Sequence, residues 1–336
     1  LSLHDALPIC FLRYYLMATY DTTIGTKDGI LREDSIYNWL NSQKDQCGYE
    51  DDPFGFVQGL TTGAERYMFY LTGGDGAGDN HLKNIVRLGG SASKLHLLLF
   101  LAAVNMDEQA LTHLKALLES MVYYSTVNQI KTNELERLYA QWCKQIREIH
   151  TDEELTSFIN NKIKPTISQW KVNNRSNFMR IGFDSMQQYR VKFILARITK
   201  YVDVRRKNGG DASNVAEFYE GGIEIEHIMP QKYSAAYGIS EDDYNAAKQR
   251  LGNLTLLEKT INASIGDDAF ASKSEAYRQS AYYLTRSIAQ LDDVGQQTAI
   301  NRMNQKLRSW SSWGPSMIED RQAILYDLSE EIWSID

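Results

Sequence analysis

The hydrophobic residues between positions 10 and 165 recur at the spacing of helices. The clearest stripe consists of Leu135, Leu138, Tyr139, Trp142, Ile146 and Ile149. Residues at this spacing lie on one face of a helix, so the stripe predicts an amphipathic helix that packs against neighbours. We therefore expect residues 10–165 to form a helical bundle or a bent helical array, in which Pro165 closes the last helix.

The pattern changes in the second half of the chain. Residues 183–207 carry a helical stripe, whereas residues 222–227 alternate hydrophobic and acidic side chains, as a strand does. Residues 241–250 begin with acids and end with bases, which favours a short helix. A second short strand is predicted at 254–257, and helical sequence resumes near Glu258. The sequence thus predicts a mainly α fold in which a compact ββα unit is embedded in helices.

Composition narrows the class of protein. The chain has 336 residues, of which 43% are hydrophobic and 24% charged, so it can bury a sizeable core and form two or three domains of about 100–200 residues. Cys10, Cys47 and Cys143 form no CxxC pair, which argues against a disulfide framework and a cysteine-rich zinc site. The longest hydrophobic run, residues 95–104, is about half the length of a membrane-spanning helix.

We therefore expect a cytoplasmic protein that does not enter a membrane. Because the chain does not start with Met, we also expect a piece of a longer reading frame. Residues 1–9 show no clear hydrophobic period, and we treat them as a leader outside the functional region.

Charge is unevenly distributed along the chain. The net charge is −7, yet residues 171–207 carry ten Lys and Arg against two Asp. A local basic stripe on an acidic protein is expected where one face meets a polyanion. The candidate DNA contacts are Arg190, Lys192, Arg197, Lys200, Arg205, Arg206 and Lys207. Charge alone is equally compatible with a solvated helix face.

Polar side chains gather in the ββα unit, where they suggest chemistry on a phosphodiester. Glu226 and His227 end the first strand, Asn253 precedes the second, and Asn262 follows early in the next helix. A carboxylate, an amide oxygen, water and a phosphate oxygen make an oxygen shell suited to Mg²⁺. His227 is then free to take a proton from water, and the Asn253 amide can tie down the loop after His227.

These residues carry a family resemblance. The segments Ile225-Glu-His-Ile-Met-Pro-Gln231 and Leu251-Gly-Asn-Leu-Thr-Leu-Leu257, followed by Asn262, resemble the motif of the HNH (ββα-metal) nucleases. With the trailing Phe270, Lys273 and Tyr277, they more narrowly resemble the C-terminal domain of GmrSD-type restriction endonucleases. The resemblance implies that residues 166–336 form an HNH-type nuclease domain with its core motif at 222–277, and that residues 10–165 form a helical middle region.

The resemblance also implies a role for each residue. His227 matches the general base, Glu226 and Asn262 match metal ligands, Asn253 matches the brace of the catalytic loop, and Lys273 is a possible phosphate contact. Glu in place of Asp and Asn in place of His both favour Mg²⁺ or Mn²⁺ over Zn²⁺.

The family further implies DNA as substrate, with modified phage DNA such as glucosylated cytosine as the target of a restriction system. It implies an N-terminal ParB/sulfiredoxin-like domain that hydrolyses nucleotides, whose Asp-Gly-Gln-Gln-Arg stretch does not occur in this sequence.

Two alternatives to a DNA endonuclease stay open at this point. The ββα unit can be an inactive nuclease that binds DNA or docks a subunit, or it can cleave RNA, because this metal site does not itself distinguish sugars. The endonuclease interpretation requires that Glu226, His227 and Asn262 converge on one pocket that solvent can reach, with Lys or Arg nearby.

Overall fold

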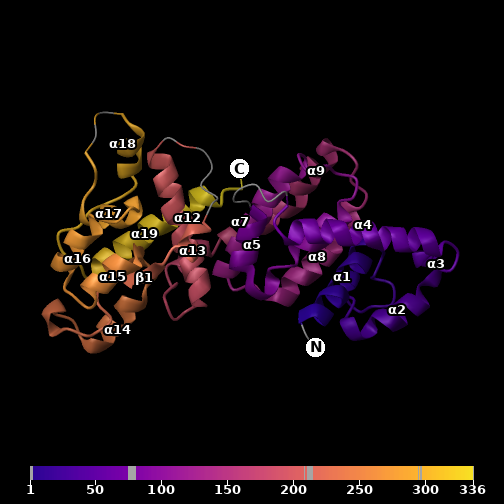
Figure 1. Cartoon of the computed structure of the whole chain (residues 1–336), viewed down its shortest axis with the longest axis horizontal. Coiled ribbons are helices and arrows are strands. Elements are labelled where there is room, and N and C mark those ends of the chain that lie inside the picture. Colours follow the sequence, from indigo (N-terminus) through magenta and orange to yellow (C-terminus); the bar gives the residue numbers. More distant parts are fainter. Residues whose placement is uncertain are drawn as a thin grey trace. The chain divides into compact units, whose positions relative to one another are not determined.

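The computed structural model describes residues 3–74, 81–207, 209, 215–293, 295 and 297–335. These residues form two compact units, the first ending at Trp170 and the second beginning at Lys171 (Figure 1). Both units consist mainly of helices, and a single pair of strands occurs among the described residues. The predicted mainly α fold is therefore confirmed.

All regular secondary structure in the described part of the first unit is helical. Its helices are α1 (Leu3–Thr19), α2 (Ile36–Ser42), α3 (Lys44–Cys47), α4 (Pro53–Leu71), α5 (His81–Gly89), α6 (His96–Ala102), α7 (Leu111–Val127), α8 (Thr132–Ile146), α9 (Asp152–Phe158) and α10 (Lys164–Lys171). Helix α6, which comes from the hydrophobic run at 95–104, is buried along its whole length, and α1, α4 and α8 pack around it. Within the described ranges, no helix combines the length and the hydrophobicity needed to span a membrane.

The expectation that Pro165 closes the helix before it is wrong. Pro165 is the second residue of α10, and a π-helical turn at Ile159–Ile163 joins α9 to α10 without a break. Pro165 therefore lies inside a continuous helical segment, and the wider π-helical turn directly before it accommodates the hydrogen bond that proline cannot donate.

The second unit embeds one hairpin-like strand pair in helices. In chain order it contains α11 (Asn174–Phe178), α12 (Gln188–Arg206), α13 (Glu217–Glu220), β1 (Ile223–His227), α14 (Glu241–Gln249), β2 (Leu254–Glu258), α15 (Lys259–Ile265), α16 (Phe270–Tyr277), α17 (Tyr283–Ala289), α18 (Ala299–Asn304) and α19 (Pro315–Ile332). Strands β1 and β2 pair antiparallel, with Ile225 opposite Leu256. The predicted strand, loop, strand and helix are therefore present, and β1, α14, α15 and α16 gather at one end of this unit (Figure 1).

Helix α12 begins later than the pattern predicts. The sequence places its start at 183, but the helix starts at Gln188. The backbone N–H of Phe183 donates to the carbonyl of Gln249 at 2.6 Å, and Gly182 forms a bridge with Arg250. These bonds require extended backbone, which hydrophobic periodicity does not reveal. They also hold the segment before α12 against the loop that leads into β2.

Candidate functional site

The end of β1 opens into a small pocket. His227 pairs with Leu254 in the strand register, and the chain leaves the sheet directly after it. The pocket has a volume of about 220 Å³ and is lined by Ile225, Glu226, His227, Gln231, Asn262, Gly266, Asp267 and Lys273. Four of the five residues to which the sequence assigns catalysis or metal binding therefore line one pocket, and Asn253 is the exception.

Glu226 is held in place from α16. Lys273 donates from Nζ to Glu226 Oε1 at 2.7 Å, and the Tyr277 hydroxyl donates to the same oxygen at 2.8 Å. Lys273 also donates to the backbone carbonyl of His227 at 2.7 Å. Lys273 and Tyr277 are one helical turn apart, so they reach the strand side by side. Burial raises the pKa of the Glu226 carboxyl, and the ammonium of Lys273 opposes that rise.

This arrangement gives Lys273 a different task from the one the sequence suggested. Its side chain is 1% exposed, and two of its three N–H donors are used inside the protein. Its role as a phosphate contact stays a prediction. The sequence pattern gives Tyr277 no role of its own, and its four-residue distance from Lys273 is the signal that points to a shared partner.

His227 combines one engaged and one unpartnered ring nitrogen. Nδ1 lies 3.3 Å from the side-chain nitrogen of Gln231, and the ring meets Phe183 edge-on with 4.9 Å between centroids. Nε2 is buried and has no hydrogen-bond partner among the described residues. Burial and the nearby ammonium groups of Lys273 and Lys248 lower the pKa of His227 to about 4. At pH 7 the imidazole is therefore neutral. Because the Gln231 amide nitrogen can only donate, the lone pair of the ring lies on Nδ1 and the buried Nε2 carries the proton.

Asn262 reaches the pocket from α15. Its Nδ2 donates to Glu224 Oε2 at 2.9 Å, and Glu224 lies on β1 two residues before Glu226. With the amide nitrogen oriented toward Glu224, the carbonyl oxygen Oδ1 accepts no hydrogen bond from any described residue and can face a cation or water. Sequence reasoning missed this use of Glu224, although β-strand alternation places it on the same face as Glu226.

Asn253 lies outside the pocket and organises the loop behind it. It is fully buried, and its Oδ1 accepts from the backbone of Met229 at 2.7 Å and from Trp313 Nε1 at 2.9 Å. Its Nδ2 donates to the carbonyls of Met229 and Lys248. Asn253 therefore fixes the chain directly after His227, and we classify it as a positioning residue that does not touch the pocket.

Gly252, the residue before Asn253, has no room for a side chain. A Cβ on Gly252 would lie 2.0 Å from the carbonyl oxygen of Ile318, because α19 packs directly on this turn. Arg321 of α19 donates to the carbonyls of Gly252 and Leu254 at 2.9 and 2.7 Å. The entry to β2 is thus clamped by α19, and that clamp sets the position of Asn253.

The pocket can accept a hard divalent cation. One oxygen of Glu226 is taken by Lys273 and Tyr277, which leaves Oε2, and Asn262 offers Oδ1. Mg²⁺ typically uses one or two protein carboxylates together with waters and substrate phosphate oxygens. No group of three His, Cys, Asp or Glu side chains that could hold a metal occurs in the described part of the chain. A cation here would therefore depend on water and substrate for most of its ligands.

The basic residues of α12 do not form an open positive face. Arg197 is only 4% exposed and lies against the Trp333 ring at 6.0 Å, so its side chain is buried and not displayed on the surface as a basic stripe requires. Its contact with DNA stays a prediction. The helix side that carries Arg197 faces the core, because α12 is covered by α17, α18 and α19.

The other candidate DNA contacts are mostly engaged locally. Lys192 donates to the Ile223 carbonyl at 2.7 Å, Lys200 pairs with Glu217 at 3.1 Å, and Arg206 pairs with Asp292 at 3.4 Å. Arg205 lies over the ring of Tyr201, and Arg190 lies over that of Tyr189. Arg205 and Lys207 are the exposed members of the set. DNA binding by this helix stays a prediction, and it falls mainly on these two residues.

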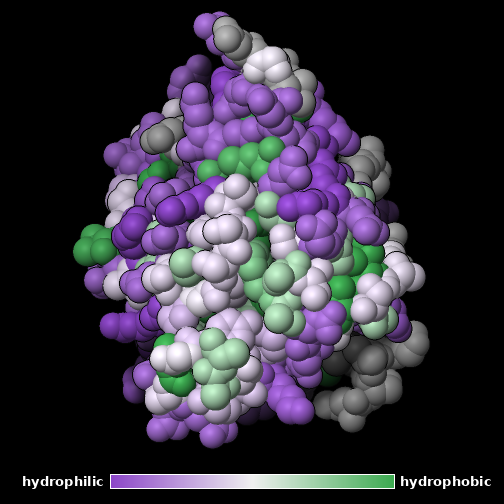
Figure 2. Space-filling model, turned by 90° about the vertical axis from the view of Figure 1, so that its left-hand side faces the viewer, coloured by the Kyte–Doolittle hydropathy of each residue, from purple (hydrophilic) through white to green (hydrophobic). Residues whose placement is uncertain are grey.

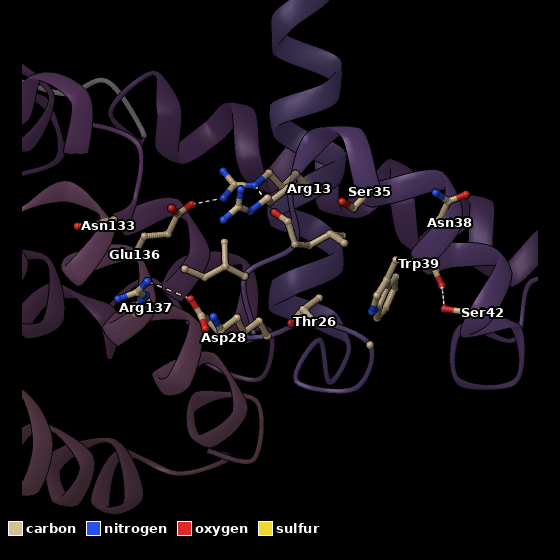
Figure 3. A pocket seen from close by; sticks show the side chains of 15 residues that line it. Arg13, Thr26, Asp28, Ser35, Asn38, Trp39, Ser42, Asn133, Glu136 and Arg137 are labelled. Carbon is tan, nitrogen blue, oxygen red and sulfur yellow. Dashed lines mark hydrogen bonds and ion pairs between the residues drawn. The ribbon is translucent and has the colours of Figure 1, made fainter.

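A separate pocket of about 700 Å³ lies in the first unit (Figure 3). Its charged side chains face each other as pairs: Arg13 contacts Glu136, and Arg137 contacts Asp28 at 3.0 Å. Lys27 and Arg32 also line this pocket, so its lining carries more basic than acidic side chains. The sequence assigns no chemistry to these residues.

Comparison with known proteins identifies the second unit. None of the curated proteins matches the chain. Residues 170–328 match the family model of the GmrSD restriction endonucleases, C-terminal domain, and this stretch contains every residue that lines the pocket at the end of β1. Residues 170–328 of the chain therefore belong to the family of C-terminal domains of GmrSD restriction endonucleases.

Proposed function

We propose that this restriction endonuclease module is a metal-dependent DNA nuclease of the HNH type. In it, His227 activates water, and Glu226 and Asn262 hold Mg²⁺ or Mn²⁺. The observation that carries the proposal is that these three side chains line one pocket together with Lys273. The family match supports the coarser statement, a restriction endonuclease.

The neutral His227 ring is suited to accept a proton. We assign this role to Nδ1, because its contact Gln231 is exposed and lines the same pocket, whereas Nε2 is buried. Water that replaces the Gln231 amide would lie within hydrogen-bonding reach of Nδ1. A phosphodiester anion in the pocket would raise the pKa of His227 from about 4 and strengthen it as a base.

The remaining residues hold the acid and the base at fixed positions. Lys273 binds both the Glu226 carboxylate and the His227 carbonyl, so it fixes the distance between strand end and α16. Asn253 fixes the following loop. When bound, a divalent cation would neutralise the phosphate and stabilise the leaving oxygen.

The biological setting follows from the family and forms part of the proposal. We propose that the module acts in the cytoplasm on foreign DNA, including modified phage DNA, together with a nucleotide-hydrolysing ParB/sulfiredoxin-like domain. The geometry of the pocket supports phosphodiester hydrolysis.

The test is cleavage of DNA by the purified chain with Mg²⁺, Mn²⁺ or EDTA. We expect divalent-dependent nicking that is lost in His227→Ala and in Glu226→Gln, and retained in His150→Ala, a matched change at an exposed histidine. Imidazole in solution should partly restore the His227→Ala enzyme, which a folding defect would not allow. Equal cleavage by wild type and His227→Ala would refute His227 as the base. A parallel RNA substrate decides between DNase and RNase.

One observation favours a second function, a binding module without catalysis. The ammonium of Lys273 already neutralises Glu226, as a cation would. Binding of DNA that does not depend on divalent ions, with no cleavage by wild type under any of these conditions, would support that alternative.

A further inference from the structure

A larger pocket with aromatic walls adjoins the Glu226–His227 site. It has a volume of about 640 Å³, within the range of small-molecule sites. Its lining includes Tyr233, Tyr237, Phe270 and Trp313. The end of the second unit that carries α14 and α16 shows a central area of weakly polar and hydrophobic residues bordered by hydrophilic ones (Figure 2).

The two pockets share a wall. Asp267 lines both of them. We call the pocket at the end of β1 the site pocket and the larger one the aromatic pocket. Pro230 and Lys232 line the aromatic pocket, while Gln231 between them lines the site pocket. In α16, Phe270 and Ala271 face the aromatic pocket and Lys273 faces the other. A polymer that binds a phosphate in the site pocket would therefore place the group next to that phosphate beside the aromatic pocket.

One wall of the aromatic pocket, formed by Tyr233 and Tyr237, is held in place by contacts within the protein. Tyr233 and Tyr237 each pack edge-on against buried Tyr244, with 5.3 and 5.4 Å between centroids. The Tyr244 hydroxyl contacts the carbonyls of Pro230 and Lys232 at 2.7 and 2.9 Å, which anchors this loop.

The opposite wall is equally fixed. Phe270 stacks on Trp313 with 5.4 Å between centroids, and the Trp313 indole donates to Asn253. Preorganised rings lose little conformational freedom on binding, so such walls favour a flat ligand.

We propose that this pocket holds one unstacked base of the DNA strand whose phosphate occupies the neighbouring site. Aromatic side chains bind bases of any sequence through their π faces, so these walls suit a base that has left the stack. Asp267 and the hydroxyls of Ser311 and Ser312 can bond the base edge, while exposed Lys232 at the rim suits a backbone phosphate. The inference rests on the proposed function, because it takes the site pocket as the place of the phosphate.

The test fills the pocket without removing its walls. Ala271 lines the pocket and is exposed, so Ala271→Trp places an indole in the space meant for a base. Ser272 is the next residue of α16, is exposed and is not among the lining residues, so Ser272→Trp is the matched control. Both changes are made in the full chain carrying His227→Ala, so that DNA stays intact. Thermal unfolding confirms that both variants fold.

The probe is a single-stranded oligonucleotide with one 2-aminopurine, whose fluorescence reports stacking. We expect the His227→Ala parent and the Ser272→Trp control to bind it with the same quenching. Ala271→Trp should bind about tenfold more weakly and lose the quenching.

Equal binding and quenching by the two tryptophan variants, or no binding by the parent, would overturn the inference. The proposed function is read separately, from divalent-dependent cleavage by the wild-type chain. A chain that cleaves but shows no difference between the variants loses only the base pocket. A chain that does not cleave but shows the Ala271→Trp defect loses only the catalytic proposal.

Discussion

The ammonium of Lys273 lies 2.7 Å from Glu226 Oε1, and both side chains are nearly excluded from solvent, at 1% and 7% exposure. This pair joins the end of β1 to α16 and sets one side of the candidate site. A buried ion pair is costly to form, but it is more costly to break, because the remaining charge is then desolvated without a partner.

Replacing Lys273 with Met should therefore destabilise the second unit by about 3–5 kcal/mol. The double variant Lys273→Met, Glu226→Gln should recover part of that loss, with a coupling energy of about 1–3 kcal/mol between the two sites. Urea unfolding followed by circular dichroism measures both. The control is Lys259→Met, because Lys259 is 70% exposed and lies 3.9 Å from Glu224, where a loss below about 1 kcal/mol is expected. Equal losses at Lys259 and Lys273 would contradict the importance of the buried pair.

Stability should also depend on pH through His227. Its pKa falls from an ordinary 6.5 to about 4 in the folded protein, so between these values the unfolded state binds more protons than the native state. Stability from this group is complete above pH 6.5 and is lost as the pH falls toward 4, by about 3 kcal/mol in total.

The comparison that isolates this contribution is wild type against His227→Gln. Urea midpoints across pH 4 to 7 should show a smaller rise with pH in the variant, since Gln does not titrate. The raised pKa of Glu226 makes stability fall as the pH rises, opposite to the effect of His227. Because Glu226 is present in both proteins, its effect cancels when their stabilities are subtracted. Parallel curves for the two proteins would show that His227 titrates normally in the folded state.

Gly252 should tolerate no side chain. Its Cβ would lie 2.0 Å from the Ile318 carbonyl oxygen and 2.9 Å from Gln322 Cβ, so α19 has to move if Ala is introduced. We expect Gly252→Ala to cost about 1–3 kcal/mol in thermal or urea unfolding. Gly314→Ala is the control, because nothing lies within 4 Å of its added methyl. A Gly252→Ala protein as stable as the Gly314→Ala protein would show that α19 does not clamp this turn.

The local pattern of the sequence was sufficient for the elements that carry the site. Alternation predicts β1, and the Glu-His pair and the later Asn lead to side chains that line the pocket, because strand ends and turns have strong local signals. Partners that arrive from distant elements could not be predicted in this way. Glu226 meets Tyr277 across 51 positions, and Asn253 meets Trp313 across 60.

The burial of Arg197 is a second feature that the local sequence pattern does not predict. Its place beside the hydrophobic stripe of α12 is compatible with solvent, and only the packing of neighbouring helices buries it. Charge counted along a helix therefore overestimates the basic surface wherever the helix is covered on more than one side.

The ligand role of Asn262 can be tested by a change of one atom. Asn262→Asp replaces the amide nitrogen that donates to Glu224 with a second oxygen, which adds a negative charge beside Glu224 and Glu226. Because hard cations bind carboxylates more strongly than amides, we expect Mn²⁺ to bind about tenfold more tightly, as measured by titration calorimetry. Asn262→Leu should abolish that binding while leaving the midpoint of unfolding nearly unchanged, since Asn262 is only half-buried.

The matched change Asn161→Asp, at an exposed asparagine of the first unit, should leave Mn²⁺ affinity as it is. Mn²⁺ affinity that is the same for Asn, Asp and Leu at position 262 would remove Asn262 from the metal site.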